Sequence, residues 1–171
     1  MNFRKAIYSD INTLVDIVNQ AVLNFKNDGI NQWQKGYPNR NVLMKDMEDG
    51  TLYVLETDGT IIGLLNLAEG PDPSYEEIEG SWMNDLPYTA FHTVSVRSDL
   101  RGNGYAGILF REAEELSRRM GYQTVRIDTH KDNKAMQHAL AKSGYQYCGS
   151  IHLAGGAEKG APRIGYQKMI K

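Results

Sequence analysis

A glycine-rich turn between two regular segments constrains the fold of this chain most. The apolar run Ala90–Val96 is typical of a β-strand, and Tyr105–Met120 repeats apolar residues at helical spacing. Between them, residues Arg101–Ala106 read Arg-Gly-Asn-Gly-Tyr-Ala. Glycines let the backbone approach a ligand closely, and the N–H groups of a first helical turn have no partners within the helix. A strand, a glycine turn and a helix N-terminus together predict an anion site suited to phosphates.

The other segments also alternate between strand and helix patterns. We expect further strands at residues 3–7, 52–56, 61–67, 124–129, 145–153 and 163–169, and further helices at 11–25, 41–48 and 133–142. Asp58-Gly59 predicts a hairpin between two of the strands. The chain has 171 residues, of which 41% are hydrophobic, enough for one core. We therefore expect a single α/β domain over residues 1–171, with a mixed, mostly antiparallel sheet flanked by helices.

Composition narrows the classes of partner and the setting. The net charge of −2 gives no general attraction to nucleic acid or to anionic lipid. No apolar run is long enough to span a membrane, and the first residues lack the apolar segment of a signal peptide. The single cysteine, Cys148, cannot form an intrachain disulfide, so we expect a cytoplasmic protein. The acidic residues of the chain concentrate between residues 46 and 96, where no Lys or Arg occurs.

Two well-known phosphate-binding motifs are alternatives for the turn. A Walker loop requires Gly-Lys-Ser/Thr at its end, whereas Gly104 is followed by Tyr105-Ala106, which excludes it. The dinucleotide pattern G-x-G-x-x-G does fit residues 102–107, and Asp128 lies where a ribose-binding acid is expected. Against it, five residues separate the strand from the first glycine, and little chain remains for further parallel strands. A dinucleotide-dependent oxidoreductase is therefore the weaker alternative.

A third interpretation fits the turn best. Residues Arg101–Ala106 resemble the Arg/Gln-x-x-Gly-x-Gly/Ala signature of the GNAT family of N-acetyltransferases, and Val94–Leu100 resembles that family's strand before the signature. Farther along, Asn133 opens a helix that ends at Lys142-Ser143-Gly144-Tyr145, as in the family's later motif. The resemblance covers nearly the whole chain and implies the GNAT fold and acetyl transfer from acetyl-CoA.

By this resemblance, the phosphate ligand is the pyrophosphate of acetyl-CoA, the co-substrate. Backbone amides from Gly102 to Gly107 would hold it. The pantetheine arm of family members lies along the preceding strand, so the backbones of Val94 and Val96 would pair with it. The Val94 amide would donate to the thioester carbonyl, where negative charge develops during the reaction. The expected cofactor-binding residues are Val94, Val96, Arg101, Gly102, Asn103, Gly104, Tyr105, Ala106, Gly107 and Asn133.

The reaction that the resemblance implies needs a neutral amine, so a base near the thioester is expected. His92 is the first candidate, because histidine titrates near neutral pH and His92 lies two residues from Val94, which places both on one face of a regular strand. A structural histidine is the alternative. Glu79, in the acidic loop, is a second candidate for the base. For Asn133, a simple N-cap is an equal alternative to a cofactor contact.

One position departs from the family pattern. Family members often place a tyrosine seven residues after the helix-opening asparagine, as an acid for the leaving thiolate, but this chain has Leu140 there. A non-catalytic acyl-CoA-binding module is therefore an alternative to an enzyme. We expect Cys148 to be structural, and the histidines show no metal-ligand spacing, so no metal is expected.

The expected acceptor is a primary amine: a small amine, an amino acid derivative or a peptide amine. The family binds acceptors through the segment after the first helix and loops near the central strands, here residues 27–38 and 70–87. Trp33, Tyr37 and Trp82 in these segments, together with carboxylates, would suit a cationic amine. The sequence leaves the oligomeric state open, and the last strand could pair with a second copy to form a homodimer.

Overall fold

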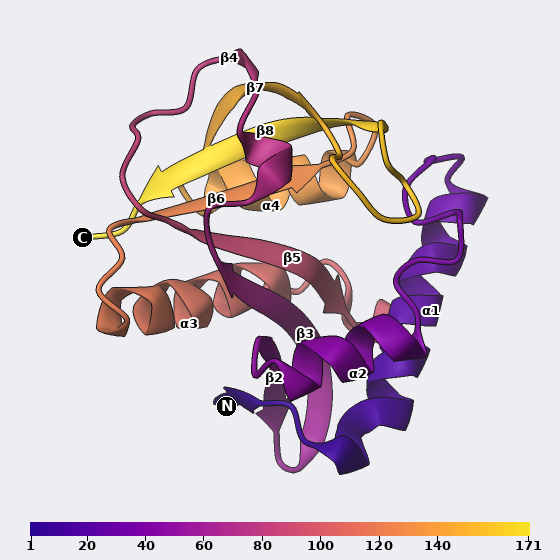
Figure 1. The fold of residues 1–171 in the computed structure, drawn as a ribbon. Coiled ribbons are helices and arrows are strands. Elements are labelled where there is room, and N and C mark those ends of the chain that lie inside the picture. The colour runs from indigo at the N-terminus through magenta and orange to yellow at the C-terminus, as the bar shows by residue number, and fades with distance from the viewer.

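The computed structural model describes residues 1–171 and contains one eight-stranded sheet with four α-helices (Figure 1). The strands are β1 (Asn2–Lys5), β2 (Leu52–Thr57), β3 (Thr60–Glu69), β4 (Glu79–Gly80), β5 (Thr89–Val96), β6 (Thr124–Thr129), β7 (Gln146–His152) and β8 (Pro162–Met169). The helices are α1 (Ile11–Asn27), α2 (Arg40–Glu48), α3 (Tyr105–Arg119) and α4 (Lys134–Lys142), with short 3₁₀ turns η1 (Tyr8–Asp10), η2 (Pro73–Tyr75) and η3 (Ser98–Leu100). The predicted elements are all present, and their ends differ from the predicted ones by at most two residues.

The strand order is β1-β2-β3-β5-β6-β8-β7-β4, and every neighbouring pair is antiparallel except β5–β6. The prediction of a mixed, mostly antiparallel sheet is confirmed. A dinucleotide-binding fold needs several parallel strands wound in both directions from a switch point, and this sheet has one parallel pair. The G-x-G-x-x-G match at residues 102–107 is therefore not a dinucleotide fingerprint.

Helices cover both faces of the sheet. The larger core packs α3 and α4, through side chains such as Leu109 and Leu140, against Leu65, Phe91 and Ile127 of the sheet. On the opposite face, α1 and α2 bury a second core that contains Leu14, Leu43 and Leu64. In Figure 1 these two helices lie together beside β2 and β3. Burial of apolar side chains on both faces holds the central strands in place.

Strand β5 contains one extra residue, which changes the direction of its side chains. Asn66 pairs with His92, but Leu64 pairs with Ser95, so one residue of β3, Leu65, lies opposite two residues of β5, Thr93 and Val94. Thr93 lies in this bulge with φ of 55°. Phe91 and Val96 consequently both contact the core beneath α3, while His92 contacts residues on the opposite face. The expectation that His92 shares a face with Val94 and Val96 is wrong, because it assumed uninterrupted alternation.

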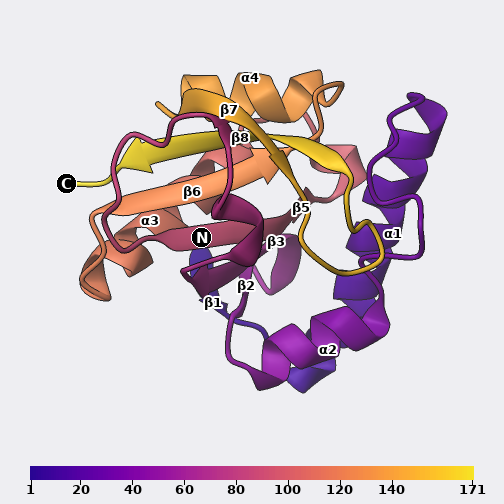
Figure 2. The same cartoon turned by 45° about the horizontal axis from the view of Figure 1, so that its top comes forward.

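The two parallel strands separate after a short paired region. They pair only over Thr89–Phe91 and Val125–Ile127, although β5 continues to Val96 and β6 to Thr129. Figure 2 shows the strands diverging toward the end where the loop between β7 and β8 lies. Backbone groups along the facing edges beyond Phe91 are therefore not used for pairing between these strands, and the opening is available to a ligand.

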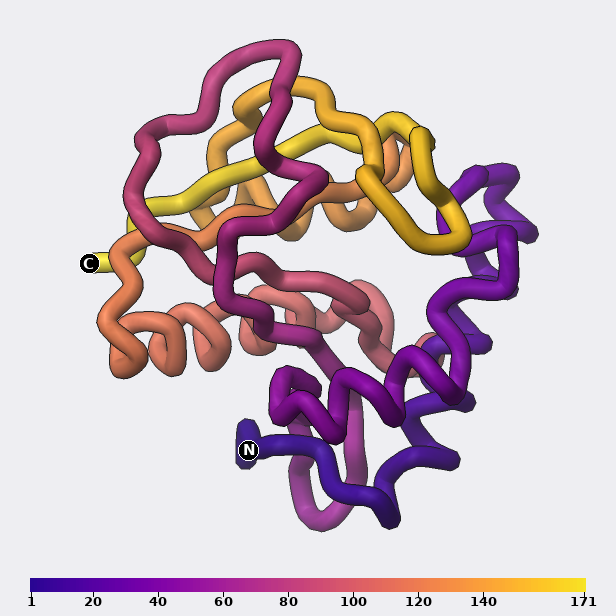
Figure 3. Tube along the Cα trace, in the orientation of Figure 1, coloured from indigo at the N-terminus to yellow at the C-terminus, as the bar shows by residue number.

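Segments far apart in sequence meet above this opening. The chain trace in Figure 3 shows the loop between β7 and β8 lying beside the connection between α1 and α2, and the Trp33 amide donates to Glu158 of that loop. The acidic segment between β3 and β5 contributes η2 and the two-residue strand β4. The sheet thus supports a site that is built from three connections and the ends of β5 and β6.

Candidate active site

The glycine turn presents free amides at the start of α3. Gly104 stands at the N-cap position with φ of 81°, and Gly102 has φ of 79°. No amide from Gly102 to Gly107 donates to a backbone oxygen or a side chain of the chain. A Cβ at Gly102 or Gly104 would meet no other atom within 4 Å, so the approach to these amides is open. The turn can therefore hold an anionic group such as a pyrophosphate through its backbone.

Other residues of the signature have different environments. The Asn103 side chain donates to the carbonyls of Leu100 and Arg101, which stabilises the turn itself. Arg101 lines a hollow of about 370 Å³ with Asn133 and Lys134, between the end of α1 and the start of α4. The N-termini of α3 and α4 thus lie at the same end of the molecule, where Arg101 and Lys134 add positive charge.

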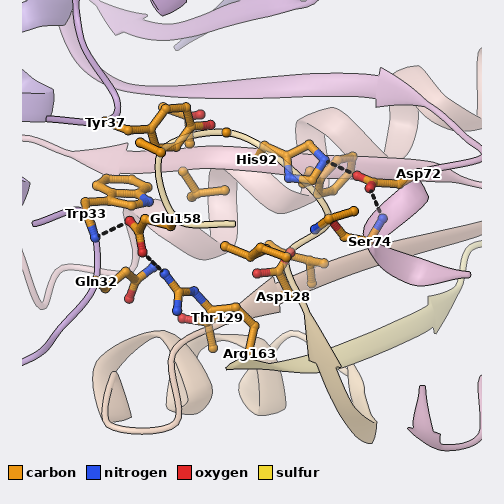
Figure 4. Close-up of a pocket in the computed structure, with 18 of the residues that line it drawn as sticks. Gln32, Trp33, Tyr37, Asp72, Ser74, His92, Asp128, Thr129, Glu158 and Arg163 are labelled. Carbon is orange, nitrogen blue, oxygen red and sulfur yellow. Dashed lines mark hydrogen bonds and ion pairs between the residues drawn. The ribbon is translucent and has the colours of Figure 1, made fainter. Parts of the chain in front are cut away.

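A cavity of about 480 Å³ lies where β5 and β6 diverge. Its walls come from the connection between α1 and α2, from η2, from the ends of β5 and β6 and from the loop between β7 and β8. The residues that line it and carry the argument below are Gln32, Trp33, Tyr37, Asp72, Ser74, His92, Thr93, Val94, Asp128, Thr129, Leu153, Glu158 and Arg163. Figure 4 shows most of these side chains around the cavity.

His92 and Asp72 form a hydrogen-bonded pair in this cavity. Nε2 of His92 lies 3.0 Å from Oδ2 of Asp72. The carboxylate is fixed in turn, because Asp72 accepts from the Ser74 amide and its own amide donates to the Tyr88 hydroxyl. Burial alone would lower the pKa of His92, but the Asp72 carboxylate and the charge of Asp128 raise it above its ordinary value. The pair can hold the imidazole in one tautomer and make it more basic.

A second pair joins Tyr75 to Asp128. The Tyr75 hydroxyl donates to Oδ2 of Asp128 at 2.7 Å. Burial raises the pKa of Asp128, although His92 and the Tyr75 hydroxyl partly offset this rise. Burial and the nearby carboxylate also keep the pKa of Tyr75 well above its ordinary value, so this hydroxyl stays protonated. Tyr75 therefore acts as a hydrogen-bond donor to Asp128 and not as a proton source at neutral pH.

A third pair fixes the loop between β7 and β8. Glu158 and Arg163 form a buried ion pair, and Oε1 of Glu158 accepts from the Trp33 amide at 2.7 Å. Buried charges persist only when paired and hydrogen-bonded, so this network resists opening. The network links Trp33, between α1 and α2, to Arg163 on β8 and forms one wall of the cavity (Figure 4).

Comparisons with known proteins agree with this arrangement. Residues 19–145 match the acetyltransferase (GNAT) family. The chain belongs to the GNAT family. A GNAT acetyltransferase from Streptococcus agalactiae is 32% identical, with a TM-score of 0.86 over 99% of this chain and 95% of that chain. The predicted family and the predicted fold are both confirmed.

More distant GNAT structures share the fold. A ribosomal-protein-alanine N-acetyltransferase from Brucella melitensis is 20% identical, with a TM-score of 0.71 over 99% of both chains. The protein yncA from Salmonella typhimurium, solved with its cofactor acetyl-CoA, is 15% identical, with a TM-score of 0.70 over 100% of this chain and 94% of that chain. A search among curated proteins gives no match. Family membership and the acetyl-CoA-bound neighbour support acyl transfer from acetyl-CoA.

The GNAT fold brings some of the predicted site residues together and separates others. His92, Val94, Trp33, Tyr37 and Asn133 all line the cavity. Asn133 also caps α4, since its Oδ1 accepts from the Met136 amide while its Nδ2 donates to Gln32, so the N-cap interpretation is confirmed. The cofactor contact of Asn133 stays a prediction, as do those of the turn.

Glu79 and Trp82 do not line the cavity. Glu79 is exposed on β4 at the edge of the sheet, paired with Ser150. Trp82 packs over the guanidinium of Arg126, and its ring contacts the backbone at Gly165. The acidic loop folds back over β7 and β8 after η2, which carries both residues away from His92. The structure therefore does not bring Glu79, the second candidate for the base, or Trp82, a candidate acceptor contact, together with His92.

Several important residues were missed by sequence reasoning. Asp72 belongs to the acidic loop that the sequence singled out, and its flanking prolines were a signal of a fixed position. Asp128 was noticed at a strand end, but for a dinucleotide ligand. Glu158 and Arg163 carried no local signal, because their pairing depends on how the last loop folds against Trp33.

The structure contains no metal site of the kind expected from clustered ligand side chains. No group of three or more His, Cys, Asp and Glu side chains is arranged to hold a metal ion. No helix has the length and apolar character required to cross a bilayer. Cys148 is half-buried, and its thiol contacts the Gln146 carbonyl at some distance from the cavity residues. The residues that line the cavity include three carboxylates, one imidazole, one guanidinium and several neutral polar and aromatic side chains.

Proposed function

We propose that this GNAT protein transfers the acetyl group of acetyl-CoA to a primary amine by direct attack, with His92 as the general base. The observation that carries the proposal is the Asp72–His92 pair, held in a cavity at the point where β5 and β6 diverge. A base in this position is next to Val94 on β5, on the strand that leads to the glycine turn. Acceptor and cofactor would thus meet at one place.

Acetyl-CoA fits the turn by three features. The amides from Gly102 to Gly107 are free, the space in front of Gly102 and Gly104 is open, and Arg101 lies nearby. We propose that these amides bind the pyrophosphate and that Asn133 contributes a contact from the start of α4. The unpaired edge of β5 would receive the pantetheine arm through Val96 and Val94. The Val94 amide would stabilise negative charge on the thioester oxygen.

The chemistry requires one proton to leave the amine. His92 accepts a proton from the attacking nitrogen, whose lone pair forms the C–N bond to the acetyl carbon. The tetrahedral intermediate then collapses, the C–S bond breaks, and coenzyme A leaves as the thiolate. Leu140 is fully buried in the core, so the position used by many GNAT tyrosines supplies no acid. Solvent or the His92 imidazolium protonates the thiolate.

The acceptor would enter from the face that carries α1 and α2. Trp33 and Tyr37 form part of the cavity wall there. The Trp33 ring packs edge-on against Phe25, with 5.5 Å between the two ring centroids. These aromatic rings can cover the body of an amine, while the carboxylates attract its positive charge. We propose Trp33 and Tyr37 as acceptor contacts.

Release of free thiol from acetyl-CoA, measured against a library of amines, tests the proposal. We expect release with at least one amine and a fall of about 100-fold in His92→Ala. The second candidate function is a non-catalytic acyl-CoA-binding module, which the buried Leu140 favours. Binding of coenzyme A without thiol release across the library would support that candidate and refute catalysis.

A further inference from the structure

The charges in the cavity do not balance. Three carboxylates line it, and two of them are paired with a side chain that is positively charged or becomes so when protonated. Glu158 is paired with Arg163, and Asp72 with His92. Asp128 is the third, and no Lys or Arg side chain bonds to it. In the view of Figure 4, Asp128 lies between the two pairs. One carboxylate in the cavity thus has no cation bonded to it, and His92, which acts on its charge, is bonded to Asp72.

Asp128 is placed to contact a ligand beside His92. Phe91 and Ile127 are aligned in the parallel pair, so the next residue of each strand, His92 and Asp128, turns toward the same face. Tyr75 bonds to one carboxylate oxygen, and the second oxygen accepts no hydrogen bond. Burial raises the pKa of this carboxyl, which means that its ionised form is poorly stabilised by the protein alone. A cationic group in the cavity would supply the missing charge.

An independent observation points to a polar ligand group at the same place. The hydroxyl of Thr129 is buried without any hydrogen-bond partner, the buried hydroxyl of Thr93 has only the Tyr37 side chain close to it, and both residues line the cavity. Thr93 is 6% exposed and Thr129 is 1% exposed. Thr93 lies in the bulge of β5 and Thr129 at the end of β6, on the two sides of the opening. A buried hydroxyl that gains a partner is stabilised, and a threonine hydroxyl can accept a hydrogen bond from an N–H group of a ligand.

The rest of the cavity combines apolar and neutral polar side chains, and it offers no free cation to a carboxylate. Phe25, Trp33, Met136 and Leu153 contribute to its walls. Its one guanidinium, that of Arg163, is buried against Glu158 and is not available to a second anion. A carboxylate attached near the amine of an acceptor would therefore lie close to Asp72 and Asp128 without a compensating cation. Like charges held close together in a low-dielectric cavity repel each other strongly, so such an acceptor is disfavoured.

We propose that the acceptor is an alkyl- or arylalkylamine without a carboxylate next to its amine, and that Asp128 binds its ammonium group. This inference rests on the proposed function, since it names the substrate class of the same site. The ammonium donates to the free oxygen of Asp128 and to the hydroxyls at the opening. The apolar body lies against Trp33 and Leu153. His92 removes one proton from the ammonium and passes it to solvent, which frees the nitrogen lone pair to attack the acetyl carbon. The second proton leaves the nitrogen through His92 as the C–S bond breaks, and it protonates the coenzyme A thiolate.

The first test compares two acceptors that differ by one group. Phenylalanine is 2-phenylethylamine with a carboxylate beside the amine. In a thiol-release assay with acetyl-CoA, we expect kcat/KM to be at least about 100-fold higher for 2-phenylethylamine. Equal use of the two compounds, or a preference for phenylalanine, would overturn the proposed substrate class. Putrescine is an alkylamine without a carboxylate and belongs to the proposed class, so it should also be acetylated with a higher kcat/KM than phenylalanine; a lower value than for phenylalanine would likewise overturn the class.

The second test measures binding without catalysis. N,N-dimethyl-2-phenylethylamine is a cation that cannot form a stable amide, and calorimetry with the full chain and coenzyme A reports its affinity. We expect at least about tenfold weaker binding to Asp128→Asn and unchanged binding to Asp16→Asn, a matched change on the exposed surface of α1. Tyr75→Phe removes the hydroxyl but keeps the carboxylate, so binding should persist in this variant.

The two tests separate the inference from the proposed function. If the cation binds through Asp128 but no amine releases thiol, the cation site stands and catalysis is refuted. If amines are acetylated but Asp128→Asn binds the cation as the parent does, the acetyltransferase stands and the role of Asp128 is refuted. If the dimethyl compound does not bind even the unchanged chain, the cation site is refuted whatever the turnover.

Discussion

The glycine turn and the cavity beside His92 are built in opposite ways. The turn is one continuous segment, residues 101–107, and it presents free backbone amides whose positions follow from local glycine conformations. The cavity combines side chains from five separate parts of the chain, of which Asp72, His92 and Glu158 are examples. The turn can thus be recognised in the sequence, whereas the cavity forms only when distant segments of the chain fold together.

This difference teaches where specificity resides in such a protein. A backbone cradle tolerates many side chains, so proteins of one family can share it while their acceptors differ. The cavity depends on individual side chains and on the pairs that hold them, such as Asp72–His92. Changes in the turn should therefore affect every acceptor equally, whereas changes in the cavity should affect acceptors selectively.

The largest effect is expected from Gly104→Glu. Gly104 has φ of 81°, a conformation that costs a side chain roughly 1–2 kcal/mol, and the new carboxylate would repel the pyrophosphate by several kcal/mol. Together these terms predict about a 1,000-fold fall in kcat/KM for acetyl-CoA. Gly59→Glu is the matched control, since Gly59 has φ of 74° in the β2–β3 hairpin and open space around it. Similar losses in both variants would contradict the assigned role of the turn.

His92→Ala should have the next largest effect, and it should be confined to the chemical step. Loss of a general base lowers kcat by about 100-fold, while the KM for acetyl-CoA stays unchanged because the turn is intact. His152→Ala, a change of an exposed histidine on β7, serves as the control. A rise in the KM for acetyl-CoA with normal kcat would show that His92 supports the cofactor site instead.

Asp72→Asn should lower the plateau rate by about tenfold and change its pH dependence. The raised pKa of His92 means that the rate of the parent rises with pH through a midpoint above about 6.5, the ordinary value for histidine. Without the Asp72 carboxylate the pKa of His92 falls, so the midpoint moves to lower pH. An unchanged midpoint in rate profiles with one amine would contradict the pairing.

We also expect Asp72→Asn to change how the stability of the fold depends on pH. The pKa of Asp72 is lowered in the folded protein and that of His92 is raised. The pair therefore stabilises the fold most between about pH 4 and pH 6.5, and this stabilisation is lost as pH rises through the folded pKa of His92. The difference in Tm between the parent and Asp72→Asn should be largest in that window and should shrink at alkaline pH.

The smallest effect is expected from Glu79→Gln. Glu79 is exposed on β4, outside the cavity, so neither kcat nor KM for any amine should change by more than about twofold. The measurement needs the same amines as the His92 variant, so that the two results can be compared directly. A tenfold loss with Glu79→Gln would mean that the acidic loop moves over the site during turnover.

Most of the fold could be predicted from the sequence because its signals are local. Apolar spacing identified α1 and α3, and Asp58-Gly59 adopts the two positive φ angles that a tight hairpin needs. The bulge at Thr93 could not be predicted, because nothing in the residues around it departs from a regular strand. It follows from the register that β3 imposes, and it decides which way His92 points.

The site was predictable to the extent that it is carried by a motif or by one strand. His92 was identified by its residue type and by its place before the turn, although the reason given for its direction was wrong. Trp33 and Tyr37 were found because their segment follows the first helix. The partners Asp72 and Glu158 could not be assigned, since their roles depend on contacts with residues 20 and 125 positions away.

A crystal structure of the full chain with acetyl-CoA would show whether the glycine turn and the cavity beside His92 bind the co-substrate as we propose. We predict that the pyrophosphate contacts the amides between Gly102 and Gly107, that the thioester oxygen accepts from the Val94 amide, and that the acetyl group enters the cavity beside His92. A pyrophosphate bound away from this turn, or an acetyl group on the opposite side of β5 from His92, would contradict the account.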